Sequence, residues 1–419
     1  MDKNFGISDY VYNLVLECEK ELTPLFLKSD EICFNNSFRV LKAFMDNNVS
    51  SIHLNGTNGY GFNDLGREVV EKIFSDVLGA EDALVRSQFI SGTHALSVCL
   101  FALLRPGDVM LSITGTPYDT LLEVIGIREN SSSLASYGIG YDEVCLKDGA
   151  FDICGILEKL KNPKIKLIEI QRSKGYSLRE SISIASISEV VKEIRKVRSD
   201  VIIMVDNCYC EFVEEKSPLE VGADVIAGSL IKNLGGGIAP VGGYIAGRSD
   251  LVKLCAERLL IPGEGKEVGA SLDINRYFLQ GIYMAPSVVN ASVKTAILTS
   301  RLLEKLGFDV FPKYDEDRAD VVQAIRFGDA SLLECYCKGI QSSSAVDSYL
   351  TPVADDMPGY DSKIIMAAGN FIQGSTIELS CDGPLRDPFV AYQQGGLTYE
   401  YGKIGVMRAV TKLLEEKEK

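Results

Sequence analysis

Val205-Asp206-Asn207 and Gly228-Ser229-Leu230-Ile231-Lys232-Asn233-Leu234-Gly235-Gly236-Gly237 are the segments that decide how this sequence folds. An apolar run over 201–205 predicts a strand ending at Asp206, and a second run over 225–227 predicts a strand that leads into Gly-Ser. Lys232 follows Ser229 by three residues. Because a buried lysine is costly when charged, such a residue tends to be neutral or covalently engaged.

Other apolar runs surround these segments, over 83–85, 109–113 and 165–170, with a further short run over 89–90. Amphipathic, helix-like stretches such as 189–197 lie between them. Strands that alternate with helices predict an α/β fold with a mostly parallel sheet and right-handed crossovers. In such sheets ligands bind beyond the carboxyl ends of the strands, so the residues after each run are candidate site residues.

The chain divides into three parts by pattern. Residues 1–48 predict an N-terminal helical arm, and residues 49–265 a large domain that holds the sheet. Residues 266–419 predict a long connecting helix over 274–306 and a smaller α+β C-terminal domain, which ends in a charged helix over 412–419.

Composition excludes several classes of function. The net charge of −15 argues against nucleic acid, whose phosphates require a basic face. No apolar run is long enough to predict a membrane span, and the N-terminus has no secretory pattern. The eleven cysteines are scattered and indicate buried thiols in a reducing cytoplasm. With only two histidines and no zinc-ligand spacing, no metal site is expected.

Lys232 and Asp206 together suit pyridoxal-phosphate chemistry. A Schiff base needs a nucleophilic amine, which Lys232 supplies. The cofactor ring also needs a carboxylate beside its pyridine nitrogen, and Asp206 stands at a strand end where it can meet that need. From this segment alone the other interpretation, a surface lysine before a glycine loop, stays open.

A second constellation is Ser91-Gly92-Thr93-His94-Ala95, which precedes an apolar helix over 95–104. Small residues at a helix N-terminus form an anion cup suited to a phosphate, although a plain helix cap fits as well. Ser229 can reach the same phosphate, and Tyr118 can stack on a flat ring or be an ordinary turn residue. For His94 we favour a local hydrogen bond over an acid–base role.

The order of these motifs resembles the fold-type I pyridoxal-phosphate enzymes, in particular the trans-sulfuration group of cystathionine lyases and methionine γ-lyase. The resemblance implies that the Ser91-Gly92-Thr93 cup and Ser229 bind phosphate, and that Lys232 forms the aldimine. It also implies that Tyr118 stacks on the ring and Asp206 holds the pyridine nitrogen. The Gly59-Tyr60-Gly61 segment resembles the loop by which a neighbouring subunit completes the phosphate site, so at least a dimer is implied, and a tetramer of two dimers is expected.

A closer resemblance is to the aluminium-resistance family of methionine γ-lyase-like proteins. Its phrases recur from about residue 50 to 400, as Pro117-Tyr118-Asp119-Thr120, Ile170-Gln171-Arg172-Ser173, Val205-Asp206-Asn207-Cys208-Tyr209, Gly228-Ser229-Leu230-Ile231-Lys232-Asn233, Met357-Pro358-Gly359-Tyr360 and Gln394-Gly395-Gly396-Leu397. The resemblance implies elimination from a sulfur amino acid, of the cystathionine β-lyase or methionine γ-lyase type. Lys232 would abstract the α-proton, and Tyr118 or Tyr60 would assist the leaving group.

The sequence departs from the lyase pattern at three positions. Ile231 stands where the group has a threonine, Phe62 where its subunit-crossing loop has an arginine, and Glu378 where an arginine binds the substrate carboxylate. The candidates for that missing guanidinium are Arg386, Arg172 and Arg179, each of which could instead form a structural ion pair.

Two other functions remain open at this point. The same fold supports aminotransferases, aldolases and decarboxylases. The second alternative is a stress-related protein with low turnover and an indirect part in metal tolerance. The leaving group and the choice between β- and γ-elimination are not determined by the sequence.

Overall fold

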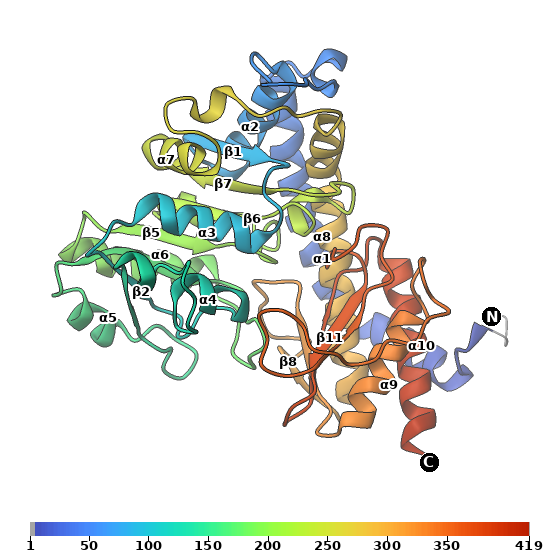
Figure 1. Cartoon of the computed structure of the whole chain (residues 1–419). Coiled ribbons are helices and arrows are strands. Elements are labelled where there is room, and N and C mark those ends of the chain that lie inside the picture. The colour runs from blue at the N-terminus through green and yellow to red at the C-terminus, as the bar shows by residue number, and fades with distance from the viewer. Residues whose placement is uncertain (1–4, 419) are drawn as a thin grey trace.

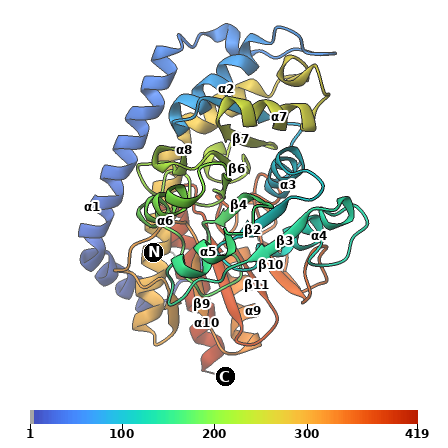
Figure 2. The same cartoon turned by 90° about the vertical axis from the view of Figure 1, so that its left-hand side faces the viewer.

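A computed structural model describes residues 5–418, which form two sheets beside two long helices (Figures 1 and 2). Residues 1–4 of the predicted arm and Lys419 of the predicted C-terminal helix lie outside the described residues. None of the helices in the described part of the chain is both long enough and apolar enough to span a bilayer.

The larger sheet has seven strands in the order β1-β7-β6-β5-β4-β2-β3. Their bounds are Asp82–Arg86 (β1), Val109–Ser112 (β2), Gly140–Glu143 (β3), Ile165–Gln171 (β4), Ile202–Asp206 (β5), Val225–Ser229 (β6) and Gly243–Gly247 (β7). β7 runs in the opposite direction to the other six strands of this sheet, so the predicted mostly parallel sheet is confirmed. The strand expected over 89–90 is wrong, because the chain leaves the sheet after Arg86 and turns into the next helix.

Helices cover both faces of this sheet. One face packs its Leu84, Met110 and Leu167 side chains under α3 (Gly92–Leu103) and α7 (Ser249–Leu259). The opposite face buries Val85, Leu111 and Ile168. The remaining helices of this region are α2 (Leu65–Leu78), α4 (Leu122–Ile125), α5 (Ile153–Lys159) and α6 (Ile184–Val197), with short 3₁₀ turns η2 (Ser51–Leu54), η3 (Asp119–Leu121), η4 (Ala135–Tyr137), η5 (Pro218–Val221), η6 (Asn233–Gly235) and η7 (Gly265–Glu267).

Two long helices run past both sheets, and Figure 2 shows the first of them along one side of the molecule. They are α1 (Asp9–Asp46) and α8 (Asn275–Lys305), which pack against each other. The smaller sheet is antiparallel, in the order β10-β11-β12-β9-β8, with bounds Asp309–Phe311 (β8), Gln323–Arg326 (β9), Ile364–Ala367 (β10), Ser380–Pro384 (β11) and Val390–Gln394 (β12). The domain boundaries at residues 48 and 265 stay a prediction.

Two helices of the C-terminal part accompany the small sheet, α9 (Ala330–Gln341) and α10 (Tyr399–Lys417). The predicted terminal helix therefore begins earlier than residue 412. Its N-cap is Thr398, whose hydroxyl accepts a hydrogen bond from the Tyr401 amide. In the same way α3 begins at Gly92 rather than Ala95, because Ser91 caps it through the His94 amide.

The glycines behind Lys232 allow its loop to lie against α8. A Cβ on Gly281 would stand 2.6 Å from the Gly235 carbonyl oxygen, and a Cβ on Gly236 would stand 2.4 Å from the Gly281 carbonyl oxygen. Both distances are closer than carbon and oxygen approach without repulsion. The glycine cluster therefore places the Lys232 loop on the helix that runs past both sheets.

We expect Gly281→Ala to destabilise the protein although alanine is the better helix former. The overlap with the Gly235 carbonyl should cost about 1–3 kcal/mol, which outweighs a gain of about 1 kcal/mol in helix propensity. Urea denaturation measures the change. Gln280→Ala, one residue away on the exposed face of α8, is the control and should change the free energy of unfolding by less than about 0.5 kcal/mol. A Gly281→Ala protein as stable as the wild type would contradict the packing argument.

Candidate active site

The carboxyl ends of β5 and β6 bring Asp206 and Lys232 to the same edge of the large sheet. Asp206 closes β5 and is 7% exposed, while Lys232 follows β6 and begins the η6 turn. The Lys232 Nζ lies 3.8 Å from the centre of the Tyr209 ring. The chain places an amine and a carboxylate in one buried region, as the parallel strands require.

Electrostatics at this edge couple the two groups. Burial raises the pKa of Asp206, and the Lys232 ammonium and the Cys208 amide act in the opposite direction. The Asp206 carboxylate accepts a hydrogen bond from the Cys208 amide at 3.0 Å. Burial alone would lower the pKa of Lys232, but the electrostatic influence of Cys208, Tyr209 and Asp206 outweighs it and raises that pKa.

The N-terminus of α3 forms a small polar cradle beside Ser229. A Cβ on Gly92 would lie 3.2 Å from the Ser229 Cβ and 3.3 Å from the Cys208 Sγ, so the helix start and β6 are in close contact. The Ser229 hydroxyl is buried and has no hydrogen-bond partner within the described part of the chain. Because buried hydroxyls are normally paired, this orphan atom at a helix N-terminus fits the predicted phosphate group.

Two other residues of the predicted cup are also near this cradle. The Ser91 hydroxyl accepts from the His94 amide at 3.1 Å, which makes Ser91 the helix cap. The Thr93 hydroxyl is 2.7 Å from that of Thr120, which follows Tyr118 by two residues. The structure therefore connects the cup with the Tyr118 segment.

Tyr118 lies in a cluster of tyrosines that motif reasoning did not assemble. Its hydroxyl is 2.8 Å from that of Tyr360. The rings of Tyr176 and Tyr360 are 5.7 Å apart, and those of Tyr176 and Tyr392 are 5.0 Å apart. Tyr360 belongs to one of the family phrases quoted above. No sequence motif pointed to Tyr176 or Tyr392, because these residues lie in a loop and a strand that are distant in the sequence.

Asp382 on β11 joins the same cluster. Its carboxylate accepts from the Tyr176 hydroxyl at 2.6 Å and from the Gln394 amide at 3.1 Å. Burial raises its pKa to about 6, and the nearby Lys232 ammonium lowers it. The small sheet thus contributes an acidic group to the side of the site facing Lys232.

The three candidate arginines have different environments. Arg172 is buried and donates to the Ile182 carbonyl, to Asn207 at 2.7 Å and to Glu214 at 2.5 Å. Arg179 donates to four backbone carbonyls, those of Gln171, Arg172, Ser173 and Glu180.

Arg386, by contrast, is exposed beyond the end of β11. Burial raises the pKa of Asp119, and the nearby Arg386 guanidinium opposes part of that rise. Of the three, Arg386 has the guanidinium most available to a ligand.

Glu378 has a structural role at the position where the resemblance expected an arginine. Its carboxylate oxygens accept from the backbone amides of Phe371 at 2.9 Å and Ile372 at 3.0 Å. The residue is 3% exposed. The glutamate that replaces the expected arginine therefore has a local structural role, because its carboxylate holds the loop before β11.

His94 makes a local contact. Its Nδ1 accepts a hydrogen bond from the Ile90 amide at 3.2 Å, and its ring packs edge-on against Phe89. Burial lowers its pKa. The favoured interpretation of a locally bonded ring matches this geometry.

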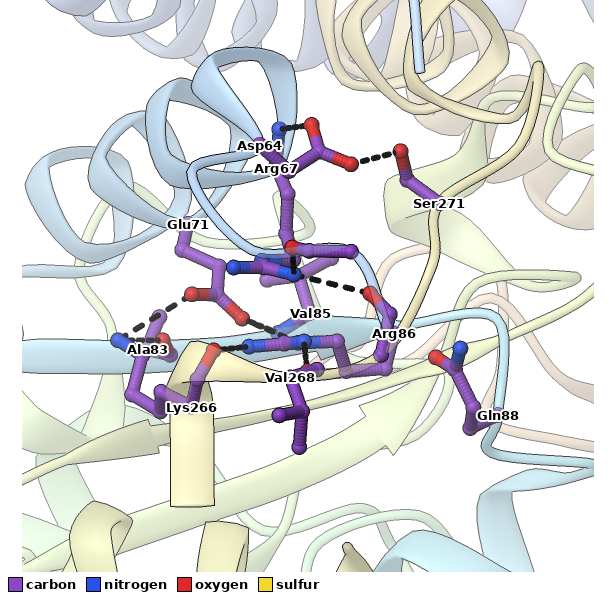
Figure 3. A network of polar contacts seen from close by, with 12 residues as sticks. Asp64, Arg67, Glu71, Ala83, Val85, Arg86, Gln88, Lys266, Val268 and Ser271 are labelled. Carbon is purple, nitrogen blue, oxygen red and sulfur yellow. Dashed lines mark hydrogen bonds and ion pairs between the residues drawn. The ribbon is translucent and has the colours of Figure 1, made fainter. Parts of the chain in front are cut away.

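Arg67, a buried cation in the network of Figure 3, holds the backbone of the Tyr60 segment. Arg67 donates to the Gly61 carbonyl at 2.7 Å and to the Gly269 carbonyl at 2.9 Å, and the Gly269 amide donates to the Tyr60 carbonyl at 2.8 Å. The Tyr60 side chain is 74% exposed and its ring lies 5.9 Å from that of Phe62. Arg67 therefore stabilises the backbone of this segment from inside the protein.

Three comparisons place the chain among known proteins. The family model described as methionine gamma-lyase matches residues 11–414. The chain is 47% identical over 404 residues to the uncharacterized protein YnbB of Bacillus subtilis (strain 168), which covers 96% of each protein. It also matches the structure of a candidate cystathionine beta-lyase involved in aluminum resistance from Clostridium acetobutylicum, with a TM-score of 0.95 and 46% identity over 98% of this chain and 97% of that one.

A more distant likeness concerns the fold alone. The pyridoxal-5'-phosphate dependent protein YhfS from Escherichia coli matches 93% of this chain and 97% of its own with a TM-score of 0.60 at 16% identity. The predicted fold-type I architecture and the resemblance to the aluminium-resistance proteins are both confirmed.

Proposed function

Because the chain belongs to the methionine gamma-lyase family, we propose that it is a pyridoxal-phosphate-dependent carbon–sulfur lyase acting on a sulfur amino acid. In the net reaction a thioether amino acid and water give a thiol, ammonia and a 2-oxo acid. The observation that carries the proposal is the meeting of Lys232, Asp206 and the orphan Ser229 hydroxyl at one sheet edge.

The residues of that edge fit the cofactor. Ser229, Gly92 and Thr93 would hold its phosphate, Asp206 its pyridine nitrogen and Lys232 its carbonyl carbon, with Tyr118 against the ring. When bound, pyridoxal phosphate supplies an electron-accepting ring that stabilises negative charge at the substrate α-carbon.

The protein's own groups handle the protons. Lys232 takes the proton from the substrate α-carbon, since its amine stands at the edge where the substrate must lie. Burial raises the pKa of Tyr118, so its hydroxyl stays protonated and can give its proton to the departing sulfur. Tyr360, whose hydroxyl is 2.8 Å away, can restore that proton.

For the substrate carboxylate we favour Arg386. Its exposed guanidinium stands near Asp119 and Tyr392. The donors of Arg172 and Arg179 are taken up by their own contacts.

The working unit we propose is a homo-oligomer, at least a dimer, in which Tyr60 of one copy completes the phosphate site of another. Two features support this. The Tyr60 side chain is exposed, and Arg67 donates to the backbone of its segment at the Gly61 carbonyl. In addition, α1 exposes an apolar stripe suited to burial against a second copy, formed by Leu27, Phe34, Phe38, Leu41 and Met45.

We place the protein in the cytoplasm, where thiols stay reduced. Within residues 5–418 no disulfide joins any of the cysteines, and the sulfurs of Cys99 and Cys255 are 4.0 Å apart.

The proposed activity is tested by incubating the cofactor-loaded protein with cystathionine, cysteine and methionine. A lyase releases thiol together with pyruvate after β-elimination, or with 2-oxobutyrate after γ-elimination. An aminotransferase would need an added 2-oxo acid and would release no thiol. Thiol release from none of these amino acids would overturn the proposal.

Ser229→Ala is expected to weaken cofactor binding by about 10- to 150-fold, the value of one hydrogen bond to a charged group. It should not destabilise the cofactor-free protein, because the hydroxyl that it removes is buried and unpaired. Fluorescence titration with pyridoxal phosphate and thermal unfolding without it measure the two effects. Equal losses in both would mean that Ser229 supports only the fold.

A further inference from the structure

Asp382 is a partly buried carboxylate that the lyase chemistry above does not use. It stands on β11 of the small sheet, and its two hydrogen-bond donors are neutral, the Tyr176 hydroxyl at 2.6 Å and the Gln394 amide at 3.1 Å. A carboxylate accepts about four hydrogen bonds, so part of its capacity remains. Among the ion pairs of residues 5–418, none is formed by Asp382.

The cation that acts on Asp382 is Lys232, which lowers the pKa of this carboxyl. In the loaded enzyme Lys232 is committed to the cofactor, so the Asp382 charge is left without a counter-ion. A buried charge without a partner is costly. A further cation at this position would offset that cost.

Aromatic rings complete the surroundings of this carboxylate. The Tyr176 ring is centred 5.0 Å from that of Tyr392 and 5.7 Å from that of Tyr360, and it lies 5.9 Å from that of Tyr118. Aromatic faces around a carboxylate form the arrangement that binds ammonium groups.

We propose that Asp382, with Tyr176, Tyr360 and Tyr392, binds an ammonium group on the leaving-group side of the substrate. This inference rests on the proposed lyase function and narrows its substrate class. The preferred substrate is a thioether amino acid whose sulfur carries a second, amino-bearing arm. Cystathionine has such an arm, whereas methionine carries only a methyl group there.

The test compares two substrates that differ by this one group. Cystathionine and S-(3-carboxypropyl)-L-cysteine have the same arm, except that the second lacks the distal ammonium. β-Elimination releases pyruvate from both. We expect the cofactor-loaded wild type to favour cystathionine in kcat/KM by about 10- to 100-fold, the value of a charge-assisted hydrogen bond in a buried site.

Asp382→Asn should remove that preference. The amide keeps the shape and can still accept from Tyr176, while Gln394, whose Oε1 is buried and unpaired, can turn to accept from it. We expect kcat/KM for cystathionine to fall about 10- to 100-fold and that for the carboxypropyl compound to change by less than about threefold. Asp361→Asn, at an exposed carboxylate paired with Arg128, is the control for charge and should keep the preference.

The two hypotheses fail in different ways. Calorimetric titration of both compounds measures binding even if turnover is absent. A preference for cystathionine in binding without thiol release would overturn the lyase function and leave the ammonium site standing. Equal kcat/KM for the two substrates, or equal losses for both in Asp382→Asn, would overturn the ammonium site alone.

The preference should also depend on pH. Burial raises the pKa of Asp382 to about 6, so its carboxylate is charged above that pH and neutral below it. Because the Lys232 ammonium that lowers this pKa is committed to the cofactor in the loaded enzyme, the ratio of the two kcat/KM values should fall as the pH drops through a pKa no lower than about 6, and stay flat in Asp382→Asn. The titratable groups that face Asp382 are Lys232, Tyr118, Tyr176, Tyr209, Tyr360 and Tyr392. A ratio that does not change with pH would contradict the proposal.

Discussion

Replacing Lys232 with alanine is expected to reduce turnover by at least about 10³-fold, because one side chain both holds the cofactor and moves the α-proton. The amine lies over the Tyr209 ring in a buried region. The variant should also lose the visible absorption of the lysine-bound cofactor. Absorption spectra and the thiol-release assay measure the two effects.

The matched control is Lys174→Met. Lys174 is also buried, and burial lowers its pKa to about 8, but its Nζ donates to the Phe311 carbonyl and not into the site. Methionine keeps the length of the chain, so the cofactor absorption should remain. If Lys174→Met lost the absorption and Lys232→Ala kept it, the assignment of the cofactor lysine would be wrong.

Asp206→Asn has the second largest expected effect, a fall of about 10²- to 10³-fold in kcat, comparable with removal of one electrostatic group in a buried site. The amide can still accept from the Cys208 amide, so the local fold should persist. It cannot carry the negative charge that keeps the ring nitrogen protonated. We therefore expect bound cofactor with little turnover, measured by absorption and pyruvate release in the same sample.

Asp224→Asn provides the contrast, because Asp224 pairs with Arg195 at 2.5 Å and Arg248 at 3.3 Å, away from the site. It should lower the free energy of unfolding by about 1–3 kcal/mol and leave kcat unchanged. Loss of kcat in Asp224→Asn to the same degree as in Asp206→Asn would mean that both aspartates act through stability.

Much of the large sheet follows from local pattern. The runs over 109–113, 165–170, 201–205 and 225–227 all became strands within a residue or two, because strands buried on both faces must be continuously apolar. The strands β3 and β7 were not among the predicted runs. The first is an edge strand with polar residues, and the second is bounded by glycines, so neither shows the apolar pattern.

The site divides in the same way. Lys232, Asp206 and Ser229 lie within about twenty-five residues of one another, and consecutive parallel strands must bring their ends to one edge. Their meeting was therefore predictable from order and spacing. The contact between Ser229 and the α3 cup joins segments far apart in the sequence, and the order of the motifs predicted it.

The prediction that Lys232 is the reactive amine thus follows from the sequence, since Asp206 and Ser229 lie near it in the chain. The fold was needed to show what stands opposite it. Asp382 on β11 meets Tyr176 from the loop after β4 across more than two hundred residues, and no local pattern encodes the packing of the small sheet against the large one. Likewise Glu378 proved to hold a loop and Arg172 an ion pair, because only tertiary contacts determine which buried charges are already satisfied.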